Sequence, residues 1–441
     1  MIDQSDDAFS VEQLDSLWAD LELSGNEKTL IITSPRPESL FAASLICRAY
    51  LTNHTPFTLT YADPVSEIDW IENISQAQGS PLTIAVGMEI HGPVEDSPNR
   101  CIFLGCDLPS ESSKRFLGSL ASLSNISFAF ADRIVSLDRW HRHLAASVVL
   151  AQKWRNFTPS PESENIIHRA LETGILEQRR GLRLFGINHL STKDVLFHSI
   201  YPYLKGLSGV EDACEKLVKD ANVPLSKRTL PMMSLSNDEK ERISQIVIHD
   251  SSNAAIDTMF GEDYVFLHES KETPARFFSS MLPLLRTCWK LLELGTAASV
   301  CIGDRSRLLH SLIKSHIEHC KGTTSGFHTL TKRADEGNFQ TSDNSVIISD
   351  LGVKPSVLPD VGRIAFDTGL FEPQRLLLLE SNHHTEVVWN SGTHTINEIL
   401  TTLENGESRI KSTSPYSLRL FDGGKSSEIA EMIHDGIKNT S

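Results

Sequence analysis

The sequence predicts an α/β protein whose first third forms a doubly wound, mostly parallel sheet. Two observations support this: short apolar, β-branched segments alternate with helical patterns, and the connections between them are short. Helical patterns then dominate the middle, and strands return near the C-terminus. We therefore expect residues 1–160 to be an α/β domain, residues 161–330 a mainly helical region, and residues 343–441 a smaller C-terminal α/β domain.

The first third contains the clearest elements. Residues 28–33 (KTLIIT) are an apolar run typical of a buried strand, and 41–51 (FAASLICRAYL) have the Ala/Ser face of a helix that packs on a sheet. The same patterns predict strands at 57–61, 82–86, 101–105 and 126–130, and helices at 11–23, 39–51, 67–77 and 111–122.

The turn between the first strand and its helix, residues 34–39, is where an α/β sheet would be expected to bind a ligand. Ligands collect beyond the carboxyl ends of parallel strands. This turn (SPRPES) offers one carboxylate, Glu38, and two prolines.

The middle and last parts are predicted from the same periodicities. Helices are expected at 138–155, 162–178, 191–201, 210–221, 236–249 and 276–294. Ser236 and Glu239 have the spacing of a capping box. Residues 322–342 are polar and turn-rich, which favours a linker. The C-terminal part has strand patterns in SVIIS, RIAFDT, RLLLLES and TEVVWN, and helical patterns at 395–404 and 425–438.

The amino-acid composition limits the functions that the chain can have. The net charge is −16, with 41 basic and 57 acidic residues, which argues against a generally basic nucleic-acid coat but permits a local groove. Seven scattered cysteines without a CxxC pair indicate reduced, buried thiols. The sequence has no apolar run of 18 residues and an acidic N-terminus, so we expect a cytoplasmic protein without a membrane partner.

A family resemblance emerges in the middle of the chain. Residues 174–240 contain LRLFG, PYLKGLSG and LSNDEK in this order, and residues 281–305 are MLPLLRTCWKLLELGTAASVCIGDR. This series resembles the archaeal RecJ-like branch of the DHH phosphoesterases. The resemblance implies a DHH-type sheet domain, a helical continuation and a DHH-associated C-terminal domain. Active members hold two divalent metals, usually manganese, between carboxylates and imidazoles.

The family's metal motifs are degraded here. By the resemblance they correspond to residues 33–39, 103–107, 132–134 and 155–164, and only two carboxylates remain, Asp107 and Asp132. We interpret both as vestigial positions that cannot hold two metals. Arg133 would also place a cation where a metal should bind. The glycine-rich, end-gripping loop of the C-terminal domain corresponds to residues 409–415 (RIKSTSP), which lack its glycines and histidine.

The resemblance therefore implies a catalytically degenerate protein without a cofactor, similar to the inactivated helicase cofactor that joins GINS and the MCM ring. We expect a structural subunit that bridges GINS and MCM and guides single-stranded DNA. Six arginines are candidate nucleic-acid contacts because guanidinium groups can follow a phosphate backbone: Arg133, Arg142, Arg155, Arg179, Arg180 and Arg183. The plainer interpretation is that they pair with the abundant Asp and Glu.

Two other functions stay open. The chain could be a manganese-dependent single-strand exonuclease or small phosphoesterase with an atypical set, Glu38, Asp107, Asp132 and Asp138. It could also be an inactive partner of an active RecJ paralogue. His141 and His143 have an i, i+2 spacing that points away from a common ion, so they are expected to be solvated or core residues. His310, His316 and His319 are expected on the surface.

Overall fold

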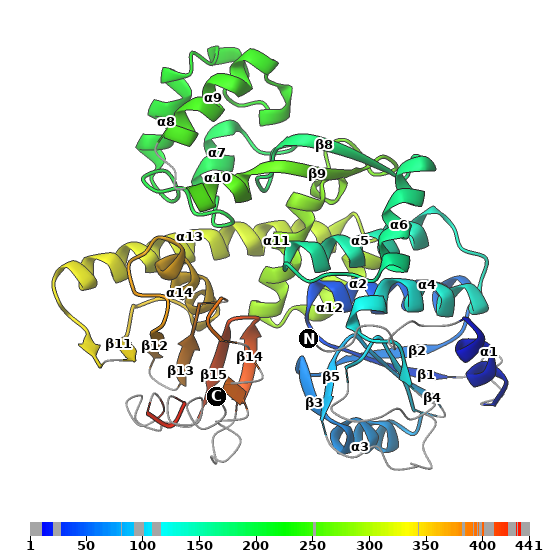
Figure 1. The fold of residues 1–441 in the computed structure, drawn as a ribbon. Coiled ribbons are helices and arrows are strands. Elements are labelled where there is room, and N and C mark those ends of the chain that lie inside the picture. The colour runs from blue at the N-terminus through cyan, green and yellow to red at the C-terminus, as the bar shows by residue number, and fades with distance from the viewer. Residues whose placement is uncertain are drawn as a thin grey trace.

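The computed structural model describes residues 11–20, 28–80, 82–91, 101–107, 116–249, 253–342, 344–381, 384–390, 392–394, 396, 399–400, 410–421, 429 and 431–433. Two sheets lie on opposite sides of the molecule, and helices run above and between them (Figure 1). A smaller helical group lies above this helical layer. The predicted α/β class with a separate C-terminal sheet is confirmed, while the exact three-part division of the chain stays a prediction.

The N-terminal sheet is parallel throughout, with the strand order β2-β1-β4-β6-β7. Its strands are β1 (Thr29–Thr33), β2 (Phe57–Tyr61), β4 (Leu82–Val86), β6 (Cys101–Leu104) and β7 (Phe116–Leu117). The strands β3 (Val65–Glu67) and β5 (Glu89–His91) form a short parallel pair. In the chain, β3 follows β2 and β5 follows β4. Because the five strands are parallel, their carboxyl ends share one edge.

Helices cover both faces of this sheet. On one face, α2 (Pro37–Thr52) packs against α4 (Leu123–Ile134), α5 (Arg139–Trp154) and α12 (Leu294–Ile302), whereas α3 (Ile68–Gln78) covers the other (Figure 1). The helices α1 (Val11–Asp20) and α6 (Pro161–Glu172) complete this part. The large core cluster here includes residues of α11 (Phe278–Leu291) and α12 as well as of the first third, so distant segments share one core.

The prediction of a strand at 126–130 is wrong, because these residues lie within α4. Leu123, Ile126 and Phe130 are fully buried at helical spacing and face the core. The helix predicted at 111–122 is also wrong where the structure describes it: β7 covers 116–117 and a 3-10 turn covers 120–122. Residues 111–115 lie outside the described part.

The middle region combines a long antiparallel strand pair with short helices. The strands β8 (Leu176–Leu182) and β9 (Phe260–Phe266) pair along their whole length. The helices are α7 (Thr192–Phe197), α8 (Glu211–Asp220), α9 (Asn237–His249) and α10 (Asn253–Met259). The helix predicted at 162–178 stops at Glu172, because the chain enters β8 at Leu176.

The capping box predicted at the start of α9 is confirmed. The Ser236 backbone N–H donates to Glu239 Oε2 at 2.6 Å, and the Glu239 N–H donates to Ser236 Oγ at 3.3 Å. Hydrogen bonds from Lys227 and from Ser236 lower the pKa of Glu239 to about 2. This carboxylate therefore stabilises the fold above the pKa of an unfolded glutamate, and its contribution is lost as the pH falls from there towards 2.

We expect Ser236→Ala to lower the free energy of unfolding by about 1 kcal/mol, because the Glu239 N–H loses its acceptor. Urea denaturation at pH 7 measures this loss. The matched control is Gln245→Ala on the exposed face of the same helix, which should change stability much less. Equal effects of the two variants would contradict the assigned cap.

The predicted linker at 322–342 is wrong over most of its length, because α13 (Arg307–Asp335) is one continuous helix. Its small residues serve close packing. A Cβ at Gly322 would lie 3.2 Å from Val357, and one at Gly326 would lie 3.0 Å from Val361. The two glycines are four residues apart, so they form one smooth face where α14 (Leu358–Asp367) approaches.

The C-terminal sheet is mixed, in the order β10-β11-β12-β13-β15-β14. Its strands are β10 (Gln340–Thr341), β11 (Ser345–Ser349), β12 (Leu376–Ser381), β13 (His384–Val388), β14 (Ile410–Ser414) and β15 (Ser417–Leu420). The strand predicted at RIAFDT is wrong, since α14 buries Val361, Ile364 and Ala365 at helical spacing. The helices predicted at 395–404 and 425–438 lie mostly outside the described residues.

Two expectations from the composition can be compared with the structure. All seven cysteine side chains are buried, as predicted, and no disulfide occurs in the described part of the chain. Of the helices that the structure describes, none combines the length and the apolar character needed to span a bilayer.

Candidate functional site

A cleft of about 670 Å³ lies between the carboxyl edge of the N-terminal sheet and the C-terminal sheet. One wall contains Arg36 and Glu38 at the start of α2, Glu89 after β4 and Asp107 after β6. The other walls come from the ends of α5 and α11 and from the turn between β14 and β15. The ligand-binding edge predicted from the turn at 34–39 is thus hollow, and both Glu38 and Asp107 line it.

Two arginine–glutamate ion pairs cross this wall. Arg36 Nη2 lies 2.6 Å from Glu89 Oε1, with the two side chains 4% and 18% exposed. Arg155, at the end of α5, forms an ion pair with Glu38, whose side chain is 3% exposed. The other carboxylate oxygen of Glu38, Oε2, is buried and has no hydrogen-bond partner among the described residues.

Asp107 is held by the backbone around it. Its Oδ1 accepts a hydrogen bond of 2.9 Å from the Leu120 N–H, and its main chain pairs with Met88 and Ile90. The carboxylate is therefore partly used in holding the first residue of the 3-10 turn at 120–122. It remains the one vestigial position that lies in the cleft.

Positive charge is in excess along the cleft. Burial, together with the neighbouring cations Arg36 and Arg286, lowers the pKa of Arg155. Arg286 also lies over the Tyr201 ring at 5.3 Å. Because guanidinium groups already pair with Glu38 and Glu89, a cation could bind these two carboxylates only by displacing an arginine, and the remaining positive charge favours an anionic group.

The far wall of the cleft is fixed by a buried network around Asp360 of α14. Lys290 Nζ lies 2.6 Å and His319 Nε2 lies 2.7 Å from Asp360 Oδ2, and the Tyr416 hydroxyl lies 3.2 Å from Oδ1. Tyr201 also donates to this carboxylate. Burial alone would raise the pKa of Asp360, but Lys290, His319 and Arg363 hold it well below its usual range.

The expectation of surface histidines is correct for His310 and wrong for His316 and His319. His319 is buried against Asp360, and His316 Nδ1 lies 2.7 Å from the Thr287 hydroxyl. Both face inward because α13 packs along α11 and α14. His141 and His143 are core residues, one of the two alternatives expected for them.

The second vestigial position, Asp132, lies elsewhere. It is exposed in the last turn of α4, so the prediction that it follows a strand is wrong. Asp138 caps α5, where it accepts the N–H groups of Trp140 and His141 and pairs with Arg48 at 3.1 Å. Of the four carboxylates in the atypical metal set, only Glu38 and Asp107 line the cleft.

The six candidate nucleic-acid arginines lie in separate places. Arg155 lies in the cleft, Arg133 pairs with Asp15 of α1, and Arg142 is exposed on α5. Arg183 donates to the Phe260 carbonyl at 3.1 Å and lies over the Trp154 ring. Arg179 and Arg180 of β8 line a second pocket of about 190 Å³ beside α9. Their role in binding nucleic acid stays a prediction.

Arg36 and Glu89 are cleft residues that the sequence analysis missed. The two lie 53 positions apart and meet because β1 and β4 are neighbours in the sheet. The available signal was the position of Arg36 in the turn itself, two residues before Glu38. The Asp360 network was missed as well, since its members come from five separate segments.

Comparisons with known proteins give structural matches only. No protein-family model and no curated protein matches the chain. The crystal structure of CDC45 from Entamoeba histolytica matches with a TM-score of 0.62 at 10% identity, covering 97% of this chain and 99% of that one. RecJ from Thermus thermophilus, in complex with Mn²⁺, matches with a TM-score of 0.50 at 11% identity, covering 99% of this chain and 56% of that one. The chain has the RecJ-like fold that CDC45 shares.

Proposed function

We propose that the chain is a non-catalytic RecJ-like subunit of an archaeal replicative helicase assembly, in which it bridges GINS and MCM and guides single-stranded DNA. The observation that carries this proposal is the pair of arginine–glutamate contacts, Arg36 with Glu89 and Arg155 with Glu38, at the edge where a two-metal centre would lie. Two guanidinium groups pair with the carboxylates at this edge, where two metals would otherwise lie.

The structural similarity supports the fold on which this proposal rests. The CDC45 structure is covered over 99% of its length and the Thermus thermophilus RecJ chain over 56%. At 10–11% identity these matches carry the fold alone. The partners come from the family resemblance, which implies GINS and MCM for an inactivated member.

We expect no manganese-dependent release of nucleotides from single-stranded DNA by the full chain, purified away from host nucleases. The reason is that Arg36 and Arg155 keep their carboxylates paired. Activity is measured with end-labelled DNA in the presence and absence of Mn²⁺. The matched control is Asp107→Asn, which should give the same background. Manganese-dependent activity that Asp107→Asn abolishes would overturn the non-catalytic proposal.

If the chain guides single-stranded DNA, its unburied arginines should contribute. We expect Arg180→Ala to weaken binding of an oligonucleotide and to reduce the slope of log affinity against log salt by about 1. Fluorescence anisotropy at several salt concentrations measures both. Arg133→Ala is the control with a smaller effect, because Arg133 is already paired with Asp15. Equal effects of both variants, or no binding at low salt, would contradict the DNA role.

One observation favours the enzyme as the second candidate function. Glu38 Oε2 and Asp107 both belong to the cleft wall, and Glu38 Oε2 is an unpartnered buried oxygen in the described structure. Such an oxygen is a possible metal ligand. A metal-dependent exonuclease would require Arg155 to leave Glu38, so Arg155→Met should then raise activity. The non-catalytic proposal expects this variant to be as inactive as the wild type.

A further inference from the structure

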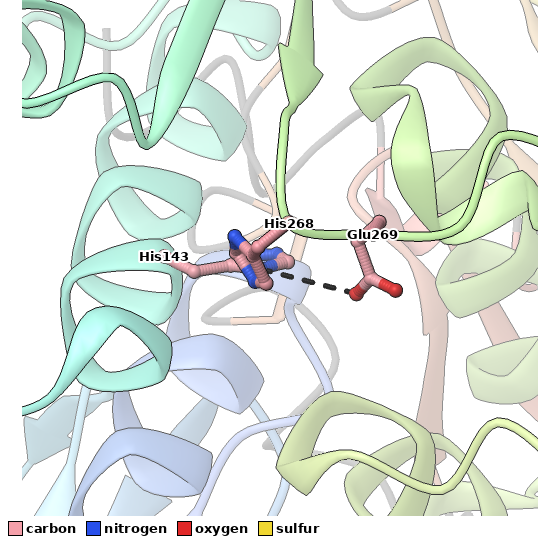
Figure 2. Close-up of side chains that lie close together, drawn as sticks. All are labelled: His143, His268 and Glu269. Carbon is pink, nitrogen blue, oxygen red and sulfur yellow. Dashed lines mark hydrogen bonds and ion pairs between the residues drawn. The ribbon is translucent and has the colours of Figure 1, made fainter.

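Outside the cleft, two buried residues, His143 and Glu269, and the half-buried His268 bring three metal-ligating atoms together. His143 comes from α5, and His268 and Glu269 follow β9 (Figure 2). His143 Nδ1 lies 3.0 Å from His268 Nε2 and 4.0 Å from Glu269 Oε1, and all three donor atoms lie within 4.8 Å of one another. None of these residues lines the cleft described above.

We propose that His143, His268 and Glu269 form a binding site for a divalent transition metal ion of the zinc type. Two imidazoles and one carboxylate are a ligand set that zinc uses in proteins. With zinc–donor bonds of about 2.0–2.2 Å, tetrahedral geometry places the donors about 3.3 Å apart. The separations of 3.0 Å and 4.0 Å from His143 Nδ1 lie on either side of this value. Small shifts of the side chains would therefore bring the three donor atoms to the distances that zinc needs.

The three side chains are held in place by their surroundings, as metal ligands usually are. The His143 ring stacks on Phe266 with a centroid distance of 3.6 Å and an interplanar angle of 11°, and it also stacks with Trp140. The His268 ring meets the Trp140 ring edge-on at 4.7 Å. These contacts keep the facing nitrogens of the two histidines directed at each other.

Glu269 is oriented by Arg305. Arg305 Nη2 lies 2.5 Å and Nε lies 3.1 Å from Oε1, and Nε also lies 3.0 Å from Oε2. Oε1 therefore has two contacts with Arg305, and an ion at Oε1 would take the place of the longer one, from Nε, which keeps its contact with Oε2. Oε1 is also the oxygen that lies 4.0 Å from His143 Nδ1.

The hydrogen bond between the two histidines fits a shared ion. His143 Nδ1 and His268 Nε2 lie 3.0 Å apart with one proton between them, so one of the two nitrogens has a lone pair. A bound metal would replace that proton and tie α5 to the segment after β9.

The test uses the full chain without a polyhistidine tag, stripped with a chelator and dialysed. We expect titration calorimetry to detect one equivalent of Zn²⁺, and Co²⁺ to give the visible absorption bands of a four-coordinate site. His268→Gln should abolish both signals. Glu269→Gln, which keeps the shape of the side chain, should weaken Zn²⁺ binding at least about 10–100-fold. Circular dichroism checks that each variant is folded.

Two control variants test whether Zn²⁺ binds at these three residues and not elsewhere on the chain. His310→Gln changes an exposed histidine of α13, and Asp107→Asn changes the cleft, so both should bind Zn²⁺ as the wild type does. The proposal is overturned if no stoichiometric Zn²⁺ binding occurs. It is equally overturned if binding survives in both His268→Gln and Glu269→Gln, or if Asp107→Asn abolishes it.

Discussion

Replacing Asp360 by alanine is expected to lower the free energy of unfolding by about 3–5 kcal/mol, the cost of removing one partner of a buried ion pair. Asp360 is fully buried, and Lys290 beside it is 3% exposed. Without the carboxylate, the Lys290 ammonium and the Arg363 guanidinium lose the anion that compensates their burial. The Tyr201 and Tyr416 hydroxyls lose an acceptor in the same change.

The position of Asp360 predicts which part of the molecule loses stability in this variant. Lys290 belongs to α11, His319 to α13 and Asp360 to α14, so the network connects the helical layer to the C-terminal sheet. We expect the transition that unfolds the C-terminal sheet to move to lower urea concentration, as measured by circular dichroism. Trp389, buried in that sheet, provides a fluorescence signal.

Asp367→Ala is the matched control. It removes the exposed partner of Arg363 on the same helix, and exposed pairs contribute about 0–1 kcal/mol. If Asp360→Ala destabilises the protein no more than Asp367→Ala does, the network has no structural role.

The stabilisation by Asp360 should also depend on pH in a defined direction. Its pKa in the folded protein lies well below the usual range, so the folded state holds this carboxylate ionised more strongly than the unfolded chain does. The contribution is complete above the pKa of an unfolded aspartate, about 3.9. It is lost as the pH falls from there towards the lower native pKa.

Arg155→Met is the second substitution with a large expected effect. Glu38 is 3% exposed and pairs with Arg155, so the variant leaves a buried carboxylate without its partner. We expect the free energy of unfolding to fall by about 3 kcal/mol.

A double-mutant cycle separates the ion pair from simple packing. In the double variant Arg155→Met with Glu38→Gln, the buried charge is gone, so we expect most of the lost stability to return. Urea denaturation of the wild type, both single variants and the double variant gives the coupling energy. Additive losses would contradict the interpretation that Arg155 takes the charge-compensating place of a metal.

The sequence predicts the N-terminal sheet well because its evidence is local. The strands β1, β2, β4 and β6 are short runs rich in apolar and β-branched residues, and parallel order follows from the alternation with helices. The wrong predictions of secondary structure arise where the polarity of the residues does not indicate how they are buried. Residues 126–130 and 363–368 are short apolar runs that fit either period, and residues 322–326 are small and polar yet form the packed face of α13.

The residues of the cleft also fall into those that the sequence predicts and those that it does not. Glu38 was predicted from the turn after the first strand and Asp107 from the family resemblance, and both lie past the carboxyl ends of strands, at the edge of the sheet. Arg36 and Glu89 were missed as a pair because contacts between separate loops leave no periodic signal. The contact between His143 and His268 spans 125 positions and depends on how β9 ends above α5, which sequence spacing alone does not encode.

Isolation of the chain from its own cells at native levels, followed by mass spectrometry of the proteins that copurify, tests the central proposal most directly. The proposal that it is a bridging subunit predicts that GINS and MCM proteins are recovered together and that nuclease treatment does not release them. Recovery of a second RecJ-like chain without GINS and MCM would contradict it, and would identify the chain as an inactive partner of an active paralogue.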